Sequence, residues 1–159
     1  MRLRFVLRVQ ALLLTVAVLT AGATTVEEFR SIGSFHNVRS STGEHCYGYS
    51  LELWRHNGRI IGLFDRHAGL CGDPPCEALQ DISYDRRSGR LSFSALDERF
   101  SGMLRRDDVV GTVGKSRVRL ARSDYAMDGK QDKSFADWCA FWRTVHRCKG
   151  VDEVCATAR

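Results

Sequence analysis

The chain has 159 residues, of which 43% are hydrophobic and 27% are charged. This composition excludes a disordered chain, and the length is that of one ordinary domain. The formal net charge of +5 is typical of proteins that bind polyanions, but the first residues of the chain contribute much of it.

The first 23 residues have the features of a secretory signal peptide: arginines, then an apolar run, then small residues. These are Arg2, Arg4 and Arg8, the run from Ala11 to Leu19, and Ala21-Gly22-Ala23. The run is too short to span a bilayer. We therefore expect cleavage near Ala23 and a periplasmic or secreted protein without a membrane span. Without this segment, 21 basic residues face 19 acidic ones, a net charge of +2, which does not favour nucleic acid as a partner.

The residues from Cys46 to Arg122 alternate between apolar and polar, and turn sequences interrupt them at nearly regular intervals, as in β-hairpins. Asn57-Gly58 is the clearest turn, because a type I′ turn needs two residues with positive φ. One strand is expected before it and one after it, at 59–65, with Gly62 as a bend or bulge. The later strands are expected at 79–84, 90–95, 99–105, 109–113 and 117–122.

An antiparallel meander removes its exposed edges most simply by closing on itself. We therefore predict a mainly β fold, an antiparallel meander of seven or eight short strands closing as a small barrel over residues 46–122. The eighth strand would come from 33–39, inside an N-terminal segment of residues 24–45. The inward positions carry bulky side chains, which favours a filled interior over a ligand cup.

One long loop, residues 66–78, separates two of the expected strands. It provides a candidate loop site made of Asp65, Arg66, His67 and Asp73. Loops on rigid scaffolds often carry function, so a small secreted enzyme remains an alternative; the simpler interpretation is that these side chains pair with local arginines or water. The chain has no recognised hydrolase, cofactor or metal motif, so we predict no catalytic residue, metal or cofactor.

Alternate turns of a meander lie at the same end, which predicts one arginine-rich end. The turns at 57–58, 86–89 and 106–108 should meet there, opposite the 66–78 loop and the turns at Asp97 and Lys115. Seven arginines face three aspartates at this end. They are Arg55, Arg59, Arg86, Arg87, Arg90, Arg105 and Arg106, against Asp85, Asp107 and Asp108. Guanidinium groups suit bidentate contact with carboxylates or phosphates, although charged turns also simply keep hairpins soluble.

Residues 123–159 form a C-terminal helical segment of the same domain. Ser134 and Asp137 have the spacing of a capping box, and Gly150 is a helix stop. Apolar residues between them recur at three- and four-residue spacing: Phe135, Trp138, Cys139, Trp142 and Val145. This stripe predicts a helix that covers one end or one outer face of the barrel. Residues 151–158 could add a last short turn held by Cys155.

All six cysteines follow the expected cleavage site, which predicts disulfides rather than a metal site. They are Cys46, Cys71, Cys76, Cys139, Cys148 and Cys155. Fifteen pairings are possible. We expect Cys71 to pair with Cys76 across the Pro74-Pro75 loop, Cys46 to tether the C-terminal segment, and the last two to pair locally.

The hairpin sequences resemble those of small exported bacterial lipocalin-like, or calycin-like, proteins. The resemblance rests on four segments: Ser88-Gly89-Arg90-Leu91-Ser92-Phe93, Phe100-Ser101-Gly102-Met103-Leu104, Val109-Val110-Gly111-Thr112-Val113 and Val118-Arg119-Leu120. It implies a small barrel and no particular chemistry.

Together these patterns predict an exported, disulfide-stapled, non-enzymatic binding or interaction module. Its partner would be a protein or an anionic envelope component, and the sequence leaves its oligomeric state open. One alternative is an inhibitor of a secreted hydrolase that inserts a rigid Cys71–Cys76 loop into a cleft. The other is the small secreted enzyme.

Overall fold

The computed structural model describes residues 28–41, 43–72, 74–123, 134–146 and 148–157. The expected signal peptide and Asp73 lie outside these residues. The strands are β1 (Phe29–His36), β2 (Arg39–Ser40), β3 (His45–His56), β4 (Arg59–Leu70), β5 (Cys76–Ala78), β6 (Gln80–Tyr84), β7 (Arg90–Ala95), β8 (Glu98–Leu104), β9 (Asp108–Val113) and β10 (Ser116–Ser123). The helical segments are α1 (Phe135–Phe141), a π-helical turn (Trp142–His146) and α2 (Val151–Thr157).

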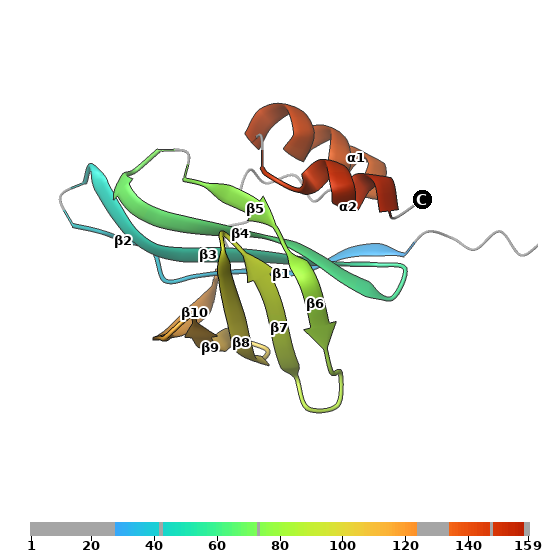
Figure 1. Cartoon of the computed structure of the whole chain (residues 1–159), viewed down its shortest axis with the longest axis horizontal. Coiled ribbons are helices and arrows are strands. Elements are labelled where there is room, and N and C mark those ends of the chain that lie inside the picture. Colours follow the sequence, from blue (N-terminus) through green and yellow to red (C-terminus); the bar gives the residue numbers. More distant parts are fainter. Residues whose placement is uncertain (1–27, 42, 73, 124–133, 147, 158–159) are drawn as a thin grey trace, which may run out of the picture.

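The strands form one antiparallel sheet that nearly closes into a barrel (Figure 1). Its order is β5-β4-β3-β1-β10-β9-β8-β7-β6, and β2 pairs with β3 outside this path. The predicted fold class, a small meander barrel with a disulfide-tethered C-terminal helix, is confirmed. The expected eighth strand is β1, which begins earlier than 33–39 and pairs with β3 on one side and β10 on the other.

The side chains that point into the barrel fill it. Five of the largest are almost fully buried: Phe35, Leu51, Phe64, Phe93 and Phe100. Phe93 stacks on Phe100 with 4.9 Å between ring centroids. The interior is therefore a packed core, and a ligand has to bind elsewhere on the molecule.

A second apolar cluster lies on the outer face of the barrel, under the helices. Trp54, Ile61 and Leu63 of β3 and β4 pack there against Phe135 and Trp138 of α1. Figure 1 shows α1 and α2 on the side of β3, β4 and β5 that faces away from β7–β10. The predicted helical stripe is thus confirmed as packing, and the Ser134 hydroxyl accepts from the Asp137 N–H at the N-cap, 3.1 Å away. All helical segments within the described residues are too short or too polar for a membrane span.

Two expectations about β4 are wrong. The expected 66–78 loop is mostly strand, because β3 and β4 stay paired from His56–Arg59 to His45–Leu70. Of the expected bend or bulge at Gly62, the bulge is wrong, since that pairing runs without a register shift. Gly62 instead allows close packing: a Cβ there would lie 2.4 Å from the Glu52 carbonyl oxygen.

The disulfides are Cys46–Cys71, Cys76–Cys148 and Cys139–Cys155. The expected Cys71–Cys76 pair is wrong, because the long β3–β4 hairpin brings Cys71 beside Cys46, with 4.9 Å between their Cα atoms. The C-terminal segment is tethered as expected, but by Cys76 instead of Cys46. The local pair within that segment is confirmed as Cys139–Cys155.

The barrel is closed along only half of its seam. On the closed half, β5 pairs with β4 over Leu63–Asp65, and the Leu79 N–H donates to the Gly62 carbonyl at 2.9 Å. Beyond this point β6 leaves β4. Asp81, with a left-handed φ of 49°, lies here, where the register of β6 against β7 shifts. Among the described residues, no backbone hydrogen bond joins β6 to the part of β4 before Gly62.

Candidate functional site

The three turns expected at one end of the barrel do lie together. Asn57 and Gly58 have φ of 46° and 79°, as a type I′ turn requires. The turn after β6 lies beside the start of the 105–108 turn, because the Leu104 N–H donates to the Gly89 carbonyl at 2.8 Å. The three arginine-bearing turns therefore lie at one end of the barrel, as predicted.

The open half of the seam forms a cleft of about 410 Å³ at this end. Three arginines from three segments line it, together with an apolar wall. The lining residues are Arg55, Gly58, Arg59, Ile60, Ile82, Tyr84 and Arg86. Ile60, Ile82 and Tyr84 also pack against the barrel core, so the wall is anchored. The cleft combines positive charge with apolar surface.

Two of the three carboxylates at this end have partners inside the protein, and the third, Asp107, is exposed. Asp85 accepts hydrogen bonds from the Ser88 hydroxyl and the Arg87 N–H, which lower its pKa below the ordinary value. Asp108 is buried and forms an ion pair with Arg119, with 2.8 Å between Nε and Oδ2. Arg55, Arg59 and Arg86 have no ion pair within the described part of the chain. Their charge is available to a ligand.

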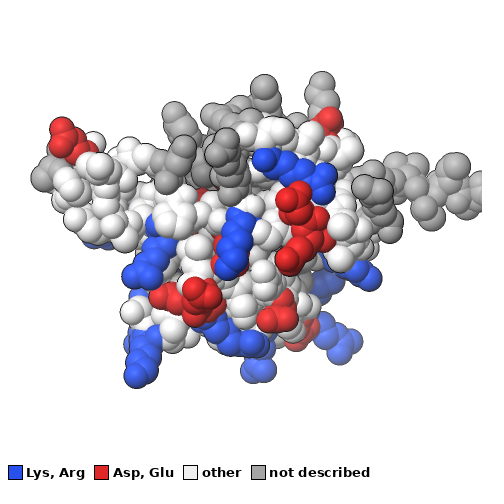
Figure 2. Space-filling model, turned by 45° about the horizontal axis from the view of Figure 1, so that its top comes forward, with Lys and Arg blue, Asp and Glu red and all other residues white. Residues whose placement is uncertain are grey.

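The other four predicted arginines lie at the same end but do not line the cleft. Arg87 and Arg105 use their backbone N–H groups inside the turns, and the Arg106 carbonyl accepts from the Arg122 side chain. Arg90 lies close enough to Asp85 to help lower the pKa of that carboxyl. Figure 2 shows basic groups predominating along the lower border of the face it presents, with acidic groups interspersed among them.

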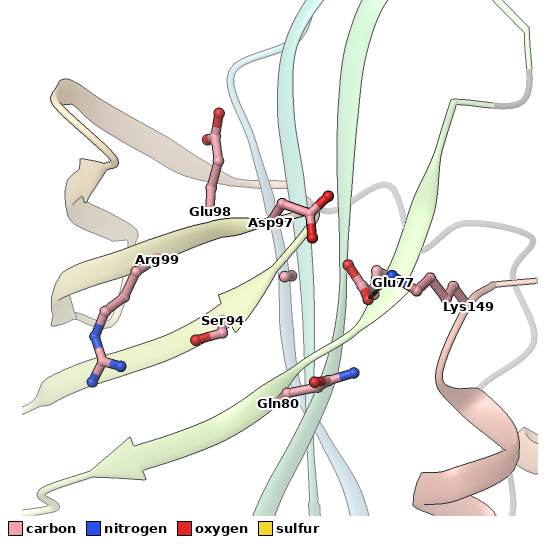
Figure 3. A pocket seen from close by; sticks show the side chains of 8 residues that line it. Glu77, Gln80, Ser94, Asp97, Glu98, Arg99 and Lys149 are labelled. Carbon is pink, nitrogen blue, oxygen red and sulfur yellow. Dashed lines mark ion pairs between the residues drawn. The ribbon is translucent and has the colours of Figure 1, made fainter.

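The opposite end, with the Asp97 and Lys115 turns, carries side chains of both charges. The Arg66 side chain donates to Glu98 at 3.4 Å, and the Gly114 N–H before the Lys115 turn donates to the Arg99 carbonyl at 3.1 Å. Glu77 is buried, accepts the Leu96 N–H of the β7–β8 turn and pairs with Lys149 at 3.1 Å. Figure 3 shows Glu77 and Asp97 beside each other in a shallow depression, with Lys149 reaching Glu77 from the C-terminal segment. Internal pairing uses much of this charge.

The predicted loop-site residues Asp65 and His67 lie on β4 and meet at Ser50 of β3. The Ser50 hydroxyl is 3.2 Å from Asp65 Oδ2, to which it donates, and 3.0 Å from His67 Nε2. Here the serine lies between the carboxylate and the imidazole, whereas a serine nucleophile needs the imidazole between them. The cluster therefore lacks the arrangement of a catalytic triad. Arg66 points to the other face of the hairpin and pairs with Glu98.

Sequence reasoning missed Ser50, although the sequence holds the signal that locates it. A two-residue turn at Asn57-Gly58 fixes the register of the hairpin, so Ser50 must face Asp65. The residues of the cleft wall could not be found in this way, because β6 is irregular at the left-handed Asp81, which no sequence pattern marks.

Asp65 gives a pH-dependent prediction. Burial raises its pKa to about 6 from 3.8, which outweighs the opposing hydrogen bond from Ser50. Because the folded state holds this proton more tightly than the unfolded state, the free energy of unfolding falls as pH rises from 3.8 through 6. At pH 7.5 the ionised group costs about 3 kcal/mol relative to its protonated form. We expect Asp65→Asn to remove this cost, so that its stability relative to wild type is higher at pH 7.5 than at pH 4.

Urea unfolding of both proteins at pH 4 and pH 7.5 measures the effect. The comparison with wild type matters because burial and nearby His36 lower the pKa of His67. A lowered histidine pKa makes the free energy of unfolding rise with pH, opposite to the effect of Asp65. Asp107→Asn, at an exposed position, is the control and should follow wild type at both pH values. A stability difference between Asp65→Asn and wild type that does not change with pH would contradict the prediction.

Comparisons with protein-family models, with curated proteins and with solved structures found no match. The site therefore has to be interpreted from its own geometry.

Proposed function

We propose that the protein is an exported, disulfide-stapled binding module that holds an anionic partner, without catalysis, in the cleft at the arginine-rich end. The observation that carries the proposal is the convergence of Arg55, Arg59 and Arg86 on one cleft. These arginines come from two neighbouring strands and a separate turn, so the barrel and not one flexible loop brings their backbone positions together. The planar guanidinium group binds carboxylate or phosphate through two parallel hydrogen bonds, which suits it to an anionic partner.

The nearby acidic groups support the same conclusion. Asp108 is paired with Arg119, and the hydrogen bonds that lower the pKa of Asp85 keep that carboxylate ionised, but the three arginines of the cleft outnumber it. The cleft lies within the size range of ordinary ligand sites. Its apolar wall would bury the less polar part of a ligand whose charged groups reach the arginines.

The test is binding to soluble polyglutamate by the wild-type protein and by the triple variant Arg55→Gln, Arg59→Gln, Arg86→Gln. Each lost charge-assisted contact weakens binding appreciably, so we expect the variant to bind at least about tenfold more weakly. Wild-type binding should also weaken as salt is raised, because part of the attraction is exposed to solvent.

The matched control removes the same charge elsewhere, with Arg39→Gln, Lys115→Gln, Arg117→Gln. All three positions are exposed and outside the cleft. We expect this control to bind within about threefold of wild type, because only the net charge has changed. Equal losses in both triple variants would show that net charge alone attracts the polymer and would refute the proposed site.

A further inference from the structure

The edge of β4 in the cleft carries free backbone groups. His56 and Arg59 pair beside the type I′ turn, so the odd-numbered residues of β4 direct their N–H and C=O groups toward β3. The even-numbered residues direct theirs away from β3. The Gly62 carbonyl and the Arg66 N–H follow this rule, since they bond to Leu79 and Pro75 outside the hairpin. Ile60 is the even-numbered residue of β4 in the cleft, and it has no such partner among the described residues.

The opposite wall of the cleft is also a free strand edge. The Asp85 N–H donates to the Arg90 carbonyl of β7, and Ser83 pairs with Ser92. The backbone groups of Ser83 in β6 and of Asp85 just after it therefore face β7. The backbone groups of Tyr84, which lies between them, therefore face the cleft. Within the described part of the chain, β6 pairs with β7 alone. Two unpaired edges thus border the same cleft.

The arginines stand directly beside the Ile60 edge. Arg59 precedes Ile60 in β4, and Arg55 is its cross-strand neighbour in β3. Because the side chains of neighbouring residues in a strand point to opposite faces, Arg55 and Arg59 lie on either side of the sheet at this edge. Arg86 faces them from the end of β6. Free main-chain groups together with alternating positive side chains are complementary to an extended chain that carries acidic side chains.

We infer that the anionic partner is an acidic segment of a protein, which adds to the sheet as an extended strand along the Ile60 edge of β4. This inference rests on the proposed function and specifies its partner. Main-chain hydrogen bonds to Ile60 hold the segment, and its carboxylates meet Arg55, Arg59 and Arg86. The added strand occupies the open half of the seam.

The probe is acetylated hexaglutamate. It is compared with two methylated forms, one N-methylated at the odd-numbered glutamates and the other at the even-numbered ones. All three peptides carry the same charge, but each methylated peptide lacks the N–H donors on one side of the strand. We expect at least one methylated peptide to bind about tenfold or more weakly than hexaglutamate, as the loss of main-chain hydrogen bonds requires.

Amide hydrogen exchange locates the added strand. Hexaglutamate should slow exchange at Ile60 by about tenfold or more, because a free amide becomes hydrogen-bonded. Ala68 is the control amide: it is another even-numbered residue on the same edge of β4, far from the cleft, and its exchange should not change. The triple variant Arg55→Gln, Arg59→Gln, Arg86→Gln should lose both binding and protection.

The outcomes separate the two proposals. If all three peptides bind equally and binding still requires the three arginines, strand addition is wrong and the anion site stands. If hexaglutamate binds wild type and the triple variant equally, or binds neither, both proposals are wrong.

Discussion

Replacing Cys76 and Cys148 with serine is expected to lower the free energy of unfolding by about 4 kcal/mol, because this disulfide closes a long loop in the unfolded chain. The two cysteines are 72 residues apart. In the folded protein their neighbours are also joined by backbone hydrogen bonds, from the Lys149 N–H to the Cys76 carbonyl and from the Ala78 N–H to the Lys149 carbonyl. The variant should therefore keep the native arrangement of strands and helices while losing stability.

Urea unfolding under non-reducing conditions measures this loss, and far-UV circular dichroism reports the retained fold. The comparison variant is Cys139→Ser, Cys155→Ser, which opens a loop of 16 residues between α1 and α2. Its expected loss is smaller, about 3 kcal/mol, because the loop is shorter. A Cys76–Cys148 variant as stable as wild type, or more stable than the comparison variant, would contradict the prediction.

Replacing Trp138 with alanine should cost about 4 kcal/mol, the usual range for deleting a fully buried aromatic side chain. Trp138 is 0% exposed and joins the helices to the barrel. Its indole lies edge-on to Trp54 of β3, with 5.5 Å between ring centroids, and parallel to Phe135, at 5.8 Å. The cavity left by alanine would lie between α1 and the strands β3 and β4, and the helix could fill it only if a strand moved.

Trp138→Phe separates packing from polarity. The indole N–H of Trp138 is buried and has no hydrogen-bond partner among the described residues. Phenylalanine removes that unpaired donor and keeps an aromatic ring, so it should cost only about 1 to 2 kcal/mol. Both values come from urea unfolding. Equal losses for the two variants would show that the indole makes an interaction that the aromatic contacts do not explain.

Much of the barrel could be predicted from local sequence because hairpins are local structures. Asn57-Gly58 sets both a turn type and a register, and every pair along β3 and β4 follows from it. The cap at Ser134 and the apolar stripe of α1 likewise depend on residues a few positions apart. The same local rules placed the arginine-rich turns at one end, since alternate hairpins of a meander must return there.

The remaining features depend on contacts between distant residues. Predicting that Cys71 pairs with Cys46 requires knowing how long β4 is, because this strand continues beyond the point where polar and apolar residues stop alternating. Predicting that Cys76 pairs with Cys148 requires knowing where the helices lie on the barrel. The cleft lies where β6 is irregular, at the left-handed Asp81, and no sequence pattern marks this residue.

The position of β1 has a consequence for the order of folding. β1 is the first described strand in the chain, yet one of its two partners is the last, through pairs such as Ser34–Ser123. During synthesis it cannot complete its pairing until the whole barrel sequence has been made. Closure of so long a loop is slow compared with the formation of a hairpin such as β3–β4. The last edge of the barrel to be paired is therefore expected to be the one between β1 and β10, and an unpaired β10 edge is a surface to which another chain could add.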